Sequence, residues 1–404
     1  MILRRLRRIW SRSPGFLGAE LLGLALLAAV PSAATTARIA ALGGRQDFFT
    51  DDAETRRWCA ALADYPGLLT IDSGRFDLGG GYHDQWGFLV SGPGVELNAD
   101  LDAAGRWGTV GFLLTARQQD ADPGSLYDKD LSGYVGGIYA RRFGSATAAV
   151  RYGRASDTTD RTGGVLKTTR TDLGCGLRMD LGQKVMLDLG GELRGISQSS
   201  TSPVPGDAVG NQDSWRSFGL RGRAFVQLGE RVALVPVAEY IHEKFHLLED
   251  VEGSLDNPPL DRDLVHLGLA LDLFPDPDKM LVCSGEWLAG SDNARITLPA
   301  DSPGGQLIDQ AVVFRLAFET RLHPLLTARA AVGLETVTRD SPTGNQDTDH
   351  VPLSMGLSLS VARMTLDLAV SDRLPQTITR LAIVSPEDED STWLTVDFRY
   401  GFGL

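Results

Sequence analysis

The sequence is poor in the residues that would indicate a disulfide-stabilised protein or a helical membrane protein. Its 404 residues include only three cysteines, Cys59, Cys175 and Cys283, and this odd number at wide spacings predicts no disulfide framework. Apart from one run near the N-terminus, no stretch approaches the ~18 consecutive apolar residues that a membrane-spanning helix needs. Any membrane crossing by this chain is therefore expected to consist of strands.

Basic residues are also scarce. Lys and Arg number 39 against 52 Asp and Glu, which gives a formal net charge of −13 at pH 7. This balance argues against nucleic acid as a partner, because surfaces that bind nucleic acid carry an excess of basic residues. The run of three glycines, Gly79 to Gly81, is not followed by Gly-Lys-Ser/Thr, so it is not a phosphate-binding loop. The sequence predicts no cofactor.

The first 34 residues have the three parts of a secretory signal peptide. Arginines at positions 4, 5, 7, 8 and 12 precede an apolar run from Phe16 to Val30, and small residues at 32–34 provide a cleavage site. A membrane anchor is the alternative, but the run is short for a spanning helix and lacks a stop-transfer flank. We therefore predict a signal peptide over residues 1–34, cleaved near Ala34.

Residues 35–66 differ from everything that follows, because they lack alternation of apolar and polar residues. Asp51 and Asp52 are positioned to cap a short helix that runs through Thr55, Trp58 and Leu62. We interpret residues 35–66 as an N-terminal periplasmic segment or a plug inside a barrel.

From residue 67 to residue 404 the chain repeatedly alternates with period two. In one example Leu173, Cys175 and Leu177 are separated by Gly174 and Gly176, so the apolar set lies on one face of a strand. The final strand repeats this pattern, and we predict it to be the membrane-assembly signal read by the barrel-assembly machinery. Its apolar set is Leu394, Val396, Phe398, Tyr400 and Phe402.

The connections between these strands alternate in length. Short turns are predicted near residues 104–106, 144, 182–183, 229–230, 275–278, 324 and 362–363. Long polar loops are predicted near residues 118–130, 156–164, 199–213, 248–261, 291–309, 339–349 and 373–390. A β-sandwich or a propeller would not produce so regular a contrast, whereas outer-membrane barrels have short periplasmic turns and long extracellular loops.

The sequence therefore predicts an all-β fold, a transmembrane antiparallel up-and-down β-barrel of about 16 strands with 14 as the alternative. Its apolar outer face would contact the lipid bilayer, and the expected location is the outer membrane of a Gram-negative bacterium.

A second indication comes from the start of the barrel region. Three short motifs occur in order: Ala41-Leu42-Gly43-Gly44, Asp51-Asp52 and Pro66-Gly67. Over about thirty residues they resemble the start of the FadL-like long-chain fatty-acid transporters and of the PorV-like secretion barrels. The resemblance implies an outer-membrane barrel that acts as a transporter or as a partner in secretion.

The inner face of the predicted barrel carries charge. Aligning Leu181 with Val185 across their turn sets acidic and basic residues opposite each other in several hairpins, although chance is an alternative explanation. Charges of either sign are too costly to face hydrocarbon, so we predict that they line a polar pore. The predicted pore-lining residues are Arg178, Asp188, Asp172, Arg194, Arg221, Glu239, Arg315, Glu319 and Arg329.

One motif points to different chemistry. His242-Glu243-Lys244-Phe245-His246 matches the zinc metalloprotease pattern H-E-x-x-H, which functions only on a helix. The residues before it alternate like a strand and include Pro236, so we predict the outer end of a strand and no metal site. His266 is expected to be a hydrogen-bonded histidine inside the barrel.

We therefore predict a channel or transporter that passes small solutes by diffusion or facilitated transport, and no enzyme. The first alternative is a non-conducting, PorV-like barrel that binds secreted or surface proteins. The second is a barrel hydrolase.

Overall fold

A computed structural model gives the fold of the chain. It describes residues 36–43, 46–50, 54–55, 57–77, 89–91, 94–101, 106–115, 134–161, 164–201, 212–245, 260–292, 307–341, 344–371 and 393–402. The predicted signal peptide and most of the predicted loops at 118–130, 199–213, 248–261, 291–309 and 373–390 lie outside these residues. The long loops predicted at 156–164 and 339–349 are wrong, because strands continue through both stretches and only two residues in each lie outside the described ranges.

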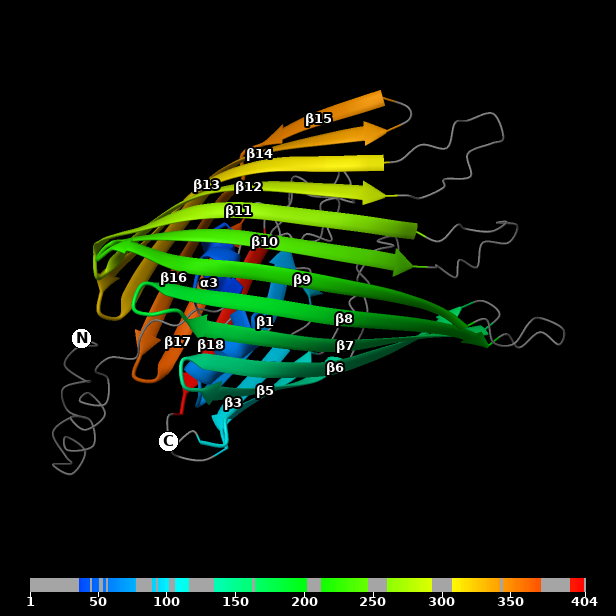
Figure 1. Ribbon diagram of the computed structural model, residues 1–404, viewed down its shortest axis with the longest axis horizontal. Helices are drawn as coiled ribbons and strands as arrows, with labels where there is room; N and C mark the ends of the chain where they lie inside the picture. Colours follow the sequence, from blue (N-terminus) through cyan, green and yellow to red (C-terminus); the bar gives the residue numbers. More distant parts are fainter. Residues whose placement is uncertain are drawn as a thin grey trace, which may run out of the picture.

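Most of the described chain is antiparallel strand, arranged as a single closed sheet (Figure 1). The first nine strands are β1 (Leu68–Asp77), β2 (Leu89–Ser91), β3 (Gly94–Asp100), β4 (Thr109–Thr115), β5 (Tyr134–Phe143), β6 (Ala146–Arg161), β7 (Gly164–Asp180), β8 (Val185–Thr201) and β9 (Gln212–Gly229). The others are β10 (Val232–Phe245), β11 (Leu260–Asp276), β12 (Lys279–Asp292), β13 (Leu307–His323), β14 (Leu326–Ser341), β15 (Gly344–His350), β16 (Leu353–Val361), β17 (Met364–Ser371) and β18 (Trp393–Gly401).

The sheet closes because β1 pairs with both β3 and β18. β2 and β3 both pair with β1, and β15 and β16 both pair with β14, so each of these two pairs occupies one position in the wall. The result is a closed barrel of 16 antiparallel strands, which confirms the predicted fold class. Apart from these two interrupted wall positions, each described strand pairs with the strand that follows it in the sequence.

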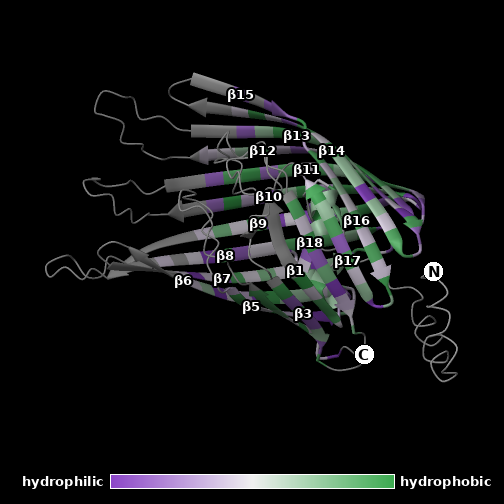
Figure 2. Ribbon diagram, turned by 180° about the vertical axis from the view of Figure 1, so that it is seen from behind, coloured by the Kyte–Doolittle hydropathy of each residue, from purple (hydrophilic) through white to green (hydrophobic). Residues whose placement is uncertain are grey.

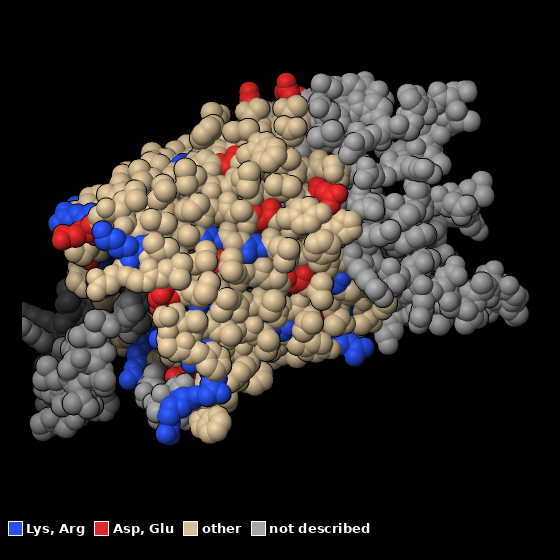
Figure 3. Space-filling view, viewed as in Figure 1, with Lys and Arg blue, Asp and Glu red and all other residues tan. Residues whose placement is uncertain are grey.

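The short turns lie where the sequence predicts them. Gly144 and Gly182 sit in two of these turns with φ of 63° and 78°, a left-handed conformation that glycine adopts without a Cβ penalty. The Gly182 turn also gives the predicted register, with the Leu181 amide donating to the Val185 carbonyl at 2.8 Å. Lys and Arg side chains gather at the barrel end that carries these turns (Figure 3).

The outer and inner faces of each strand differ in polarity, as alternation requires. In β16 the outward Leu353, Met355 and Leu357 are 54%, 65% and 48% exposed, whereas the inward Ser354 and Ser358 are 6% and 1% exposed. Alternating bands of hydrophobic and hydrophilic residues run along the strands in Figure 2. A belt of exposed leucine, valine and phenylalanine side chains around the barrel has the character of a lipid-facing surface.

Within the described ranges no helix is long and apolar enough to cross a membrane. The helical elements are short: α3 (Thr36–Ala41), η1 (Gln46–Phe48) and η3 (Cys59–Asp64). The helix predicted through Thr55, Trp58 and Leu62 occurs only in part: residues 54–55 and 59–64 are 3-10 helix, whereas Arg57 and Trp58 between them are not helical. The predicted cap, Asp51 and Asp52, lies outside the described residues.

Candidate functional site inside the barrel

The described part of residues 36–66, here called the inner segment, packs against the inner wall of the barrel. α3 is surrounded by strands in Figure 1, and its Ala37, Ala40 and Ala41 form a buried cluster with Ala369 of β17. On the other side of the barrel, η3 packs against Ile138 of β5 and its neighbours. The inner segment therefore spans the interior from one wall to the other.

Glycines of the wall provide the room that this close packing needs. At four inward glycines on four strands, a Cβ would lie within 3.1 Å of a side chain of the inner segment, closer than real Cβ contacts. Any other residue would push the inner segment away from the wall. The pairs are Gly111 with Leu62, Gly176 with Cys59, Gly268 with Phe48 and Gly356 with Ala41.

Glu54 is the centre of the first ionic anchor between the inner segment and the wall. One of its oxygens accepts from Arg178 at 2.9 Å and the other accepts from Arg223. Both arginines also bind Asp188, and Arg178 reaches Asp64 at 2.6 Å. All five side chains except Asp64 are almost fully buried, so each buried charge is matched by an opposite one.

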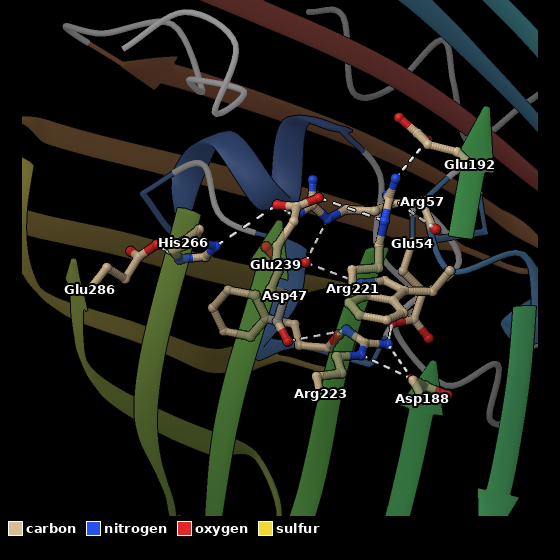
Figure 4. A network of polar contacts seen from close by, with 12 residues as sticks. Asp47, Glu54, Arg57, Asp188, Glu192, Arg221, Arg223, Glu239, His266 and Glu286 are labelled. Carbon is tan, nitrogen blue, oxygen red and sulfur yellow. Dashed lines mark hydrogen bonds and ion pairs between the residues drawn. The ribbon is translucent and has the colours of Figure 1, made fainter. Parts of the chain in front are cut away.

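Arg57 forms the second anchor (Figure 4). It donates to Asp47 within the inner segment at 2.7 Å and to Glu239 of β10 at 2.6 Å. Burial works against the charge of Arg57, but the two carboxylates more than offset this and raise its pKa above the ordinary value. The guanidinium therefore stays charged and holds the inner segment to β10.

The third anchor lies at α3. Arg38 donates to Glu319 of β13 at 2.7 Å, and Glu319 also accepts from Arg329 of β14. The backbone N–H of Ala37 donates to Asp397 of β18 at 2.5 Å. Strands β13 and β18 thus both contribute to holding α3.

A histidine lies between two of these carboxylates. His266 of β11 is fully buried, its Nε2 is 3.0 Å from Glu286 Oε2, and its Nδ1 is 4.0 Å from Glu239 Oε2 (Figure 4). Arg315 of β13 binds the other oxygen of Glu286 at 2.5 Å. The prediction of a hydrogen-bonded interior histidine agrees with this geometry.

The inner face of β6–β9, here called the charged wall, carries more arginines than carboxylates. Glu192 accepts from Arg151 at 3.0 Å and Arg221 at 2.5 Å, whereas Arg194 lies at 3.5 Å from it. Asp172 binds Arg170 at 2.9 Å and lies 3.4 Å from Arg194. Four guanidinium groups therefore share two carboxylates, and Arg194, 26% exposed, has only long contacts.

Part of the inner face next to the charged wall is apolar. Inward side chains from five adjacent strands, β10 to β14, form one buried cluster in the half of these strands away from the short turns. We call it the apolar wall, and its members are Ile241, Leu264, Leu288, Ala311, Val313 and Val337. The inner face is thus charged over β6–β9, whereas over β10–β14 it carries charged groups such as Glu239 and Glu286 nearer the short turns and the apolar wall beyond them.

The structure places the predicted inner-face residues on the inner face, in the predicted register. The four cross-strand pairs are Arg178 with Asp188, Asp172 with Arg194, Arg221 with Glu239, and Glu319 with Arg329. Several of these residues differ from the prediction in their environment, because they are buried against the inner segment and do not face open water. Their role as pore-lining residues stays a prediction.

Sequence reasoning missed the partners supplied by the inner segment. Glu54, Arg57 and Asp47 come from a stretch with no periodicity, and Arg223 was not singled out although it shares a face with Arg221. Arg223 is completely enclosed, stacked between the rings of Trp58 at 4.6 Å and Phe225 at 4.8 Å. The sequence does contain one signal of this packing: Gly176 and Gly268 occupy inward positions on otherwise regular strands, which indicates that another part of the chain approaches closely there.

The H-E-x-x-H motif lies on a strand. His242 is on the outer face of β10, with Nδ1 3.0 Å from Asp263 and its ring 5.3 Å from that of Phe218. The motif therefore lies on strand β10 and not on the helix that its zinc chemistry requires, and His246 lies outside the described residues. No group of three possible metal ligands occurs among the described residues.

Comparison with known proteins gives structural neighbours only. No protein-family model matches the chain, and no curated protein matches it either. Among solved structures, the chain is similar to a Pseudomonas aeruginosa FadL homologue, with 13% identity, a TM-score of 0.46, and coverage of 92% of this chain and 99% of that one. It is also similar to the Ralstonia pickettii toluene transporter TbuX (9% identity, TM-score 0.40, 92% and 98% covered). A third neighbour is CdiB from Escherichia coli, with 12% identity, a TM-score of 0.48, and 83% and 63% covered.

Proposed function

We propose that the chain is an outer-membrane channel or transporter for small solutes that combine an apolar body with an anionic group. The observation that carries this proposal is the division of the lumen into a charged wall and an apolar wall. The exposed apolar belt and the predicted signal peptide support the outer membrane as its location.

The charged wall supplies the anion recognition. Arg194 is the arginine of the charged wall that is best placed to bind a solute, because its contacts to Asp172 and Glu192 are 3.4 and 3.5 Å long and its side chain is partly exposed. A carboxylate on a passing solute gains a charge-assisted, bidentate hydrogen bond from such a guanidinium. The excess of arginine over carboxylate on β6–β9 favours an anion over a cation.

The apolar wall supplies the second half of the specificity. Leu288 and Val313 are about 1% exposed in a cluster that contains no polar side chain. A ring or a short aliphatic chain gains about 25 cal/mol for each Å² of apolar area that it removes from water there. Sugars and small ions gain nothing from this surface.

The inner segment acts in this proposal as a plug that closes the resting lumen. A 16-strand barrel is wide enough to leave an aqueous channel unless something fills it. Three ionic anchors and four glycine contacts hold the inner segment across the interior. Transport then requires this segment to shift, and no enzymatic step is involved.

Uptake by proteoliposomes tests the proposal. Benzoate is expected to enter several-fold faster than benzylamine, which has the opposite charge, and faster than acetate, which lacks the ring. Arg194→Gln should remove the preference for benzoate over benzylamine while the barrel still folds. Equal rates for all three solutes, in vesicles that contain correctly folded barrel, would contradict the proposed selectivity.

Planar-bilayer recordings separate this proposal from its rival. The Glu54→Ala variant is recorded because this change is expected to release the inner segment. If the folded variant shows no conductance and instead binds a secreted or surface protein, the chain is an interaction barrel and not a channel.

A further inference from the structure

Arg141 of β5 points away from the lumen, towards the lipid-facing surface. The residues on either side of it along the inner face, Ile138 and Ala140 among them, are buried, so positions 139, 141 and 143 occupy the outer face. The turn at Gly144 follows directly, which places Arg141 at the short-turn end of the barrel. At the edge of the apolar belt a charge on the outer face costs far less than it does at mid-membrane.

Two aromatic rings flank this arginine. The guanidinium carbon of Arg141 lies 6.0 Å from the ring centroid of Trp107 and 5.2 Å from that of Phe143. Both rings lie on the surface themselves, 63% and 57% exposed. Because the faces of aromatic rings attract a cation, the two rings keep the guanidinium close to the barrel surface at the edge of the belt.

The position of Trp107 is determined by its backbone. Tyr139 donates its hydroxyl hydrogen to the Trp107 carbonyl at 2.9 Å. The next residue, Gly108, has a φ of 87°, and a Cβ on it would lie 3.1 Å from the Tyr139 ring and 3.3 Å from Arg141 Cβ. Glycine permits both the left-handed conformation and the close approach, so the turn lies against β5 with Trp107 beside Arg141.

Arg141 differs from other arginines at the same end of the barrel, because those have carboxylate partners. Arg142 pairs with Asp64, and Arg321 lies 3.7 Å from Asp278. Among the described residues no carboxylate pairs with Arg141, whose contacts are the two aromatic rings. The rings do not neutralise the charge, so the five N–H donors of the guanidinium are available to an anion from outside the protein.

The neighbouring strand leaves the guanidinium accessible. Ala148 lies directly opposite Arg141 on β6, and Ala146 lies opposite Phe143, so the side chains next to the site are small. Val150, the next outward residue on β6, is exposed and continues the apolar belt towards mid-membrane. An acyl chain that lies along Ala148 and Val150 brings its headgroup to Arg141.

From this geometry we propose that Arg141, Trp107 and Phe143 form a binding site for the phosphate of an anionic phospholipid in the leaflet at the short-turn end. The planar guanidinium donates two parallel hydrogen bonds to phosphate oxygens, and the rings lie at the depth where aromatic side chains meet headgroups. Arg106, exposed in the same turn as Trp107, adds positive charge, and Lys and Arg side chains gather at this end of the barrel (Figure 3). The site is independent of any solute in the lumen.

The apolar surroundings favour a lipid over free phosphate as the source of the anion. Both offer the same oxygens to Arg141. Only a lipid also covers the exposed rings of Trp107 and Phe143 and the apolar belt beside them, which removes apolar area from water.

Native mass spectrometry of the full-length barrel in detergent tests the proposal. The protein is titrated with dioctanoyl phosphatidylglycerol, with the phosphatidylcholine of the same acyl chains, and with inorganic phosphate. Phosphatidylglycerol is expected to bind the unaltered protein about fivefold more tightly than Arg141→Gln, the change that one basic group near a membrane surface produces. Heat-modifiable gel migration shows that each variant has folded.

Arg321→Gln is the matched control. It removes the same charge from the same end of the barrel, at a side chain that already faces Asp278 and donates to the Pro324 carbonyl at 3.0 Å. Its affinity for phosphatidylglycerol should equal that of the unaltered protein. Equal affinities of the unaltered protein and Arg141→Gln, or an equal loss in Arg321→Gln, overturn the site.

Two further variants examine the chemistry of recognition. Trp107→Ala should weaken phosphatidylglycerol binding, because the guanidinium loses one of its rings. Arg141→Lys should keep the preference for phosphatidylglycerol over phosphatidylcholine at a lower affinity, because an ammonium keeps the charge and lacks the planar pair of donors. If inorganic phosphate binds as tightly as phosphatidylglycerol and Arg141→Gln removes both, the site binds a free ion and the lipid proposal is wrong.

Discussion

Two regions of the barrel wall, the charged wall and the apolar cluster around Phe48, hold the inner segment by different forces. On β7–β9, Glu54 is fixed by two buried arginines, so the interaction is directional and each member depends on the others. On β10–β14, Phe48 and Leu42 pack against small and aliphatic side chains, where the interaction is spread over many weak contacts. The comparison indicates that ionic contacts, which Arg57 and Arg38 also make to β10 and β13, fix the position of the segment, whereas the apolar contacts specify it less sharply.

Breaking the ionic side should have the largest effect. Glu54→Gln leaves Arg223 with Asp188 alone and Arg178 with Asp188 and Asp64, and loss of one partner of a buried pair costs about 3–5 kcal/mol. The inner segment should dissociate, seen as faster alkylation of Cys59 and higher conductance. The control is Glu230→Gln, the same change at an exposed turn, which should alter neither. Equal behaviour of the two variants would contradict the proposed anchor.

The chemistry of Cys59 itself should show how tightly η3 is enclosed on the charged side. Burial raises the pKa of the Cys59 thiol to about 11, and the ordinary value is 9.0. Alkylation of this residue should therefore be about a hundredfold slower than that of an exposed thiol at pH 8. The rate should continue to rise above pH 9, and a plateau there would indicate that η3 leaves the wall.

On the apolar side a methyl group should be enough to disturb the contact. Gly268→Ala places a Cβ 2.9 Å from Phe48, and such overpacking costs about 1–3 kcal/mol. Chemical unfolding and the Cys59 rate should both show the loss. Gly195→Ala on β8 is the matched control, because nothing lies within 4 Å of its Cβ. A similar loss in both variants would point to strand propensity instead of contact with Phe48.

The smallest effect is expected from a polar substitution of unchanged shape in the apolar wall. Val313→Thr buries a hydroxyl at a side chain that is 1% exposed, at a cost of about 1–3 kcal/mol when the group lacks a partner. Benzoate uptake should fall a few-fold while acetate uptake is unchanged. If both fall equally, the apolar wall supports the barrel without contacting solute.

The barrel wall could be predicted from the sequence because strand alternation and turn register depend only on residues close together in the chain. Alternation fixes which residues point outward, and the turn at Gly182 then fixes that Arg178 faces Asp188. The partner Glu54 lies 124 positions away in a stretch without periodicity, so no local rule connects it to Arg178. For the same reason the inner face was expected to be wet, although the inner segment covers much of it.

Gly176 shows at a single residue how far prediction from the sequence reaches. Its inward position on β7 was clear from parity, but a glycine there indicates only that something approaches closely. The identity of that neighbour, Cys59, depends on how a non-repetitive segment folds inside the finished barrel. The apolar wall was hidden in the same way, because a strand with apolar residues on both faces gives no period-two signal.

The position of α3 has a consequence for biogenesis. α3 precedes every described strand in the sequence, yet it rests on β17 and its Ala37 backbone N–H donates to Asp397 of β18, the last described strand. β18 also forms the seam with β1 that shuts the cylinder. The surface on which α3 rests is therefore complete only after β18 has joined the barrel, so α3 is expected to dock late although it precedes every described strand in the sequence.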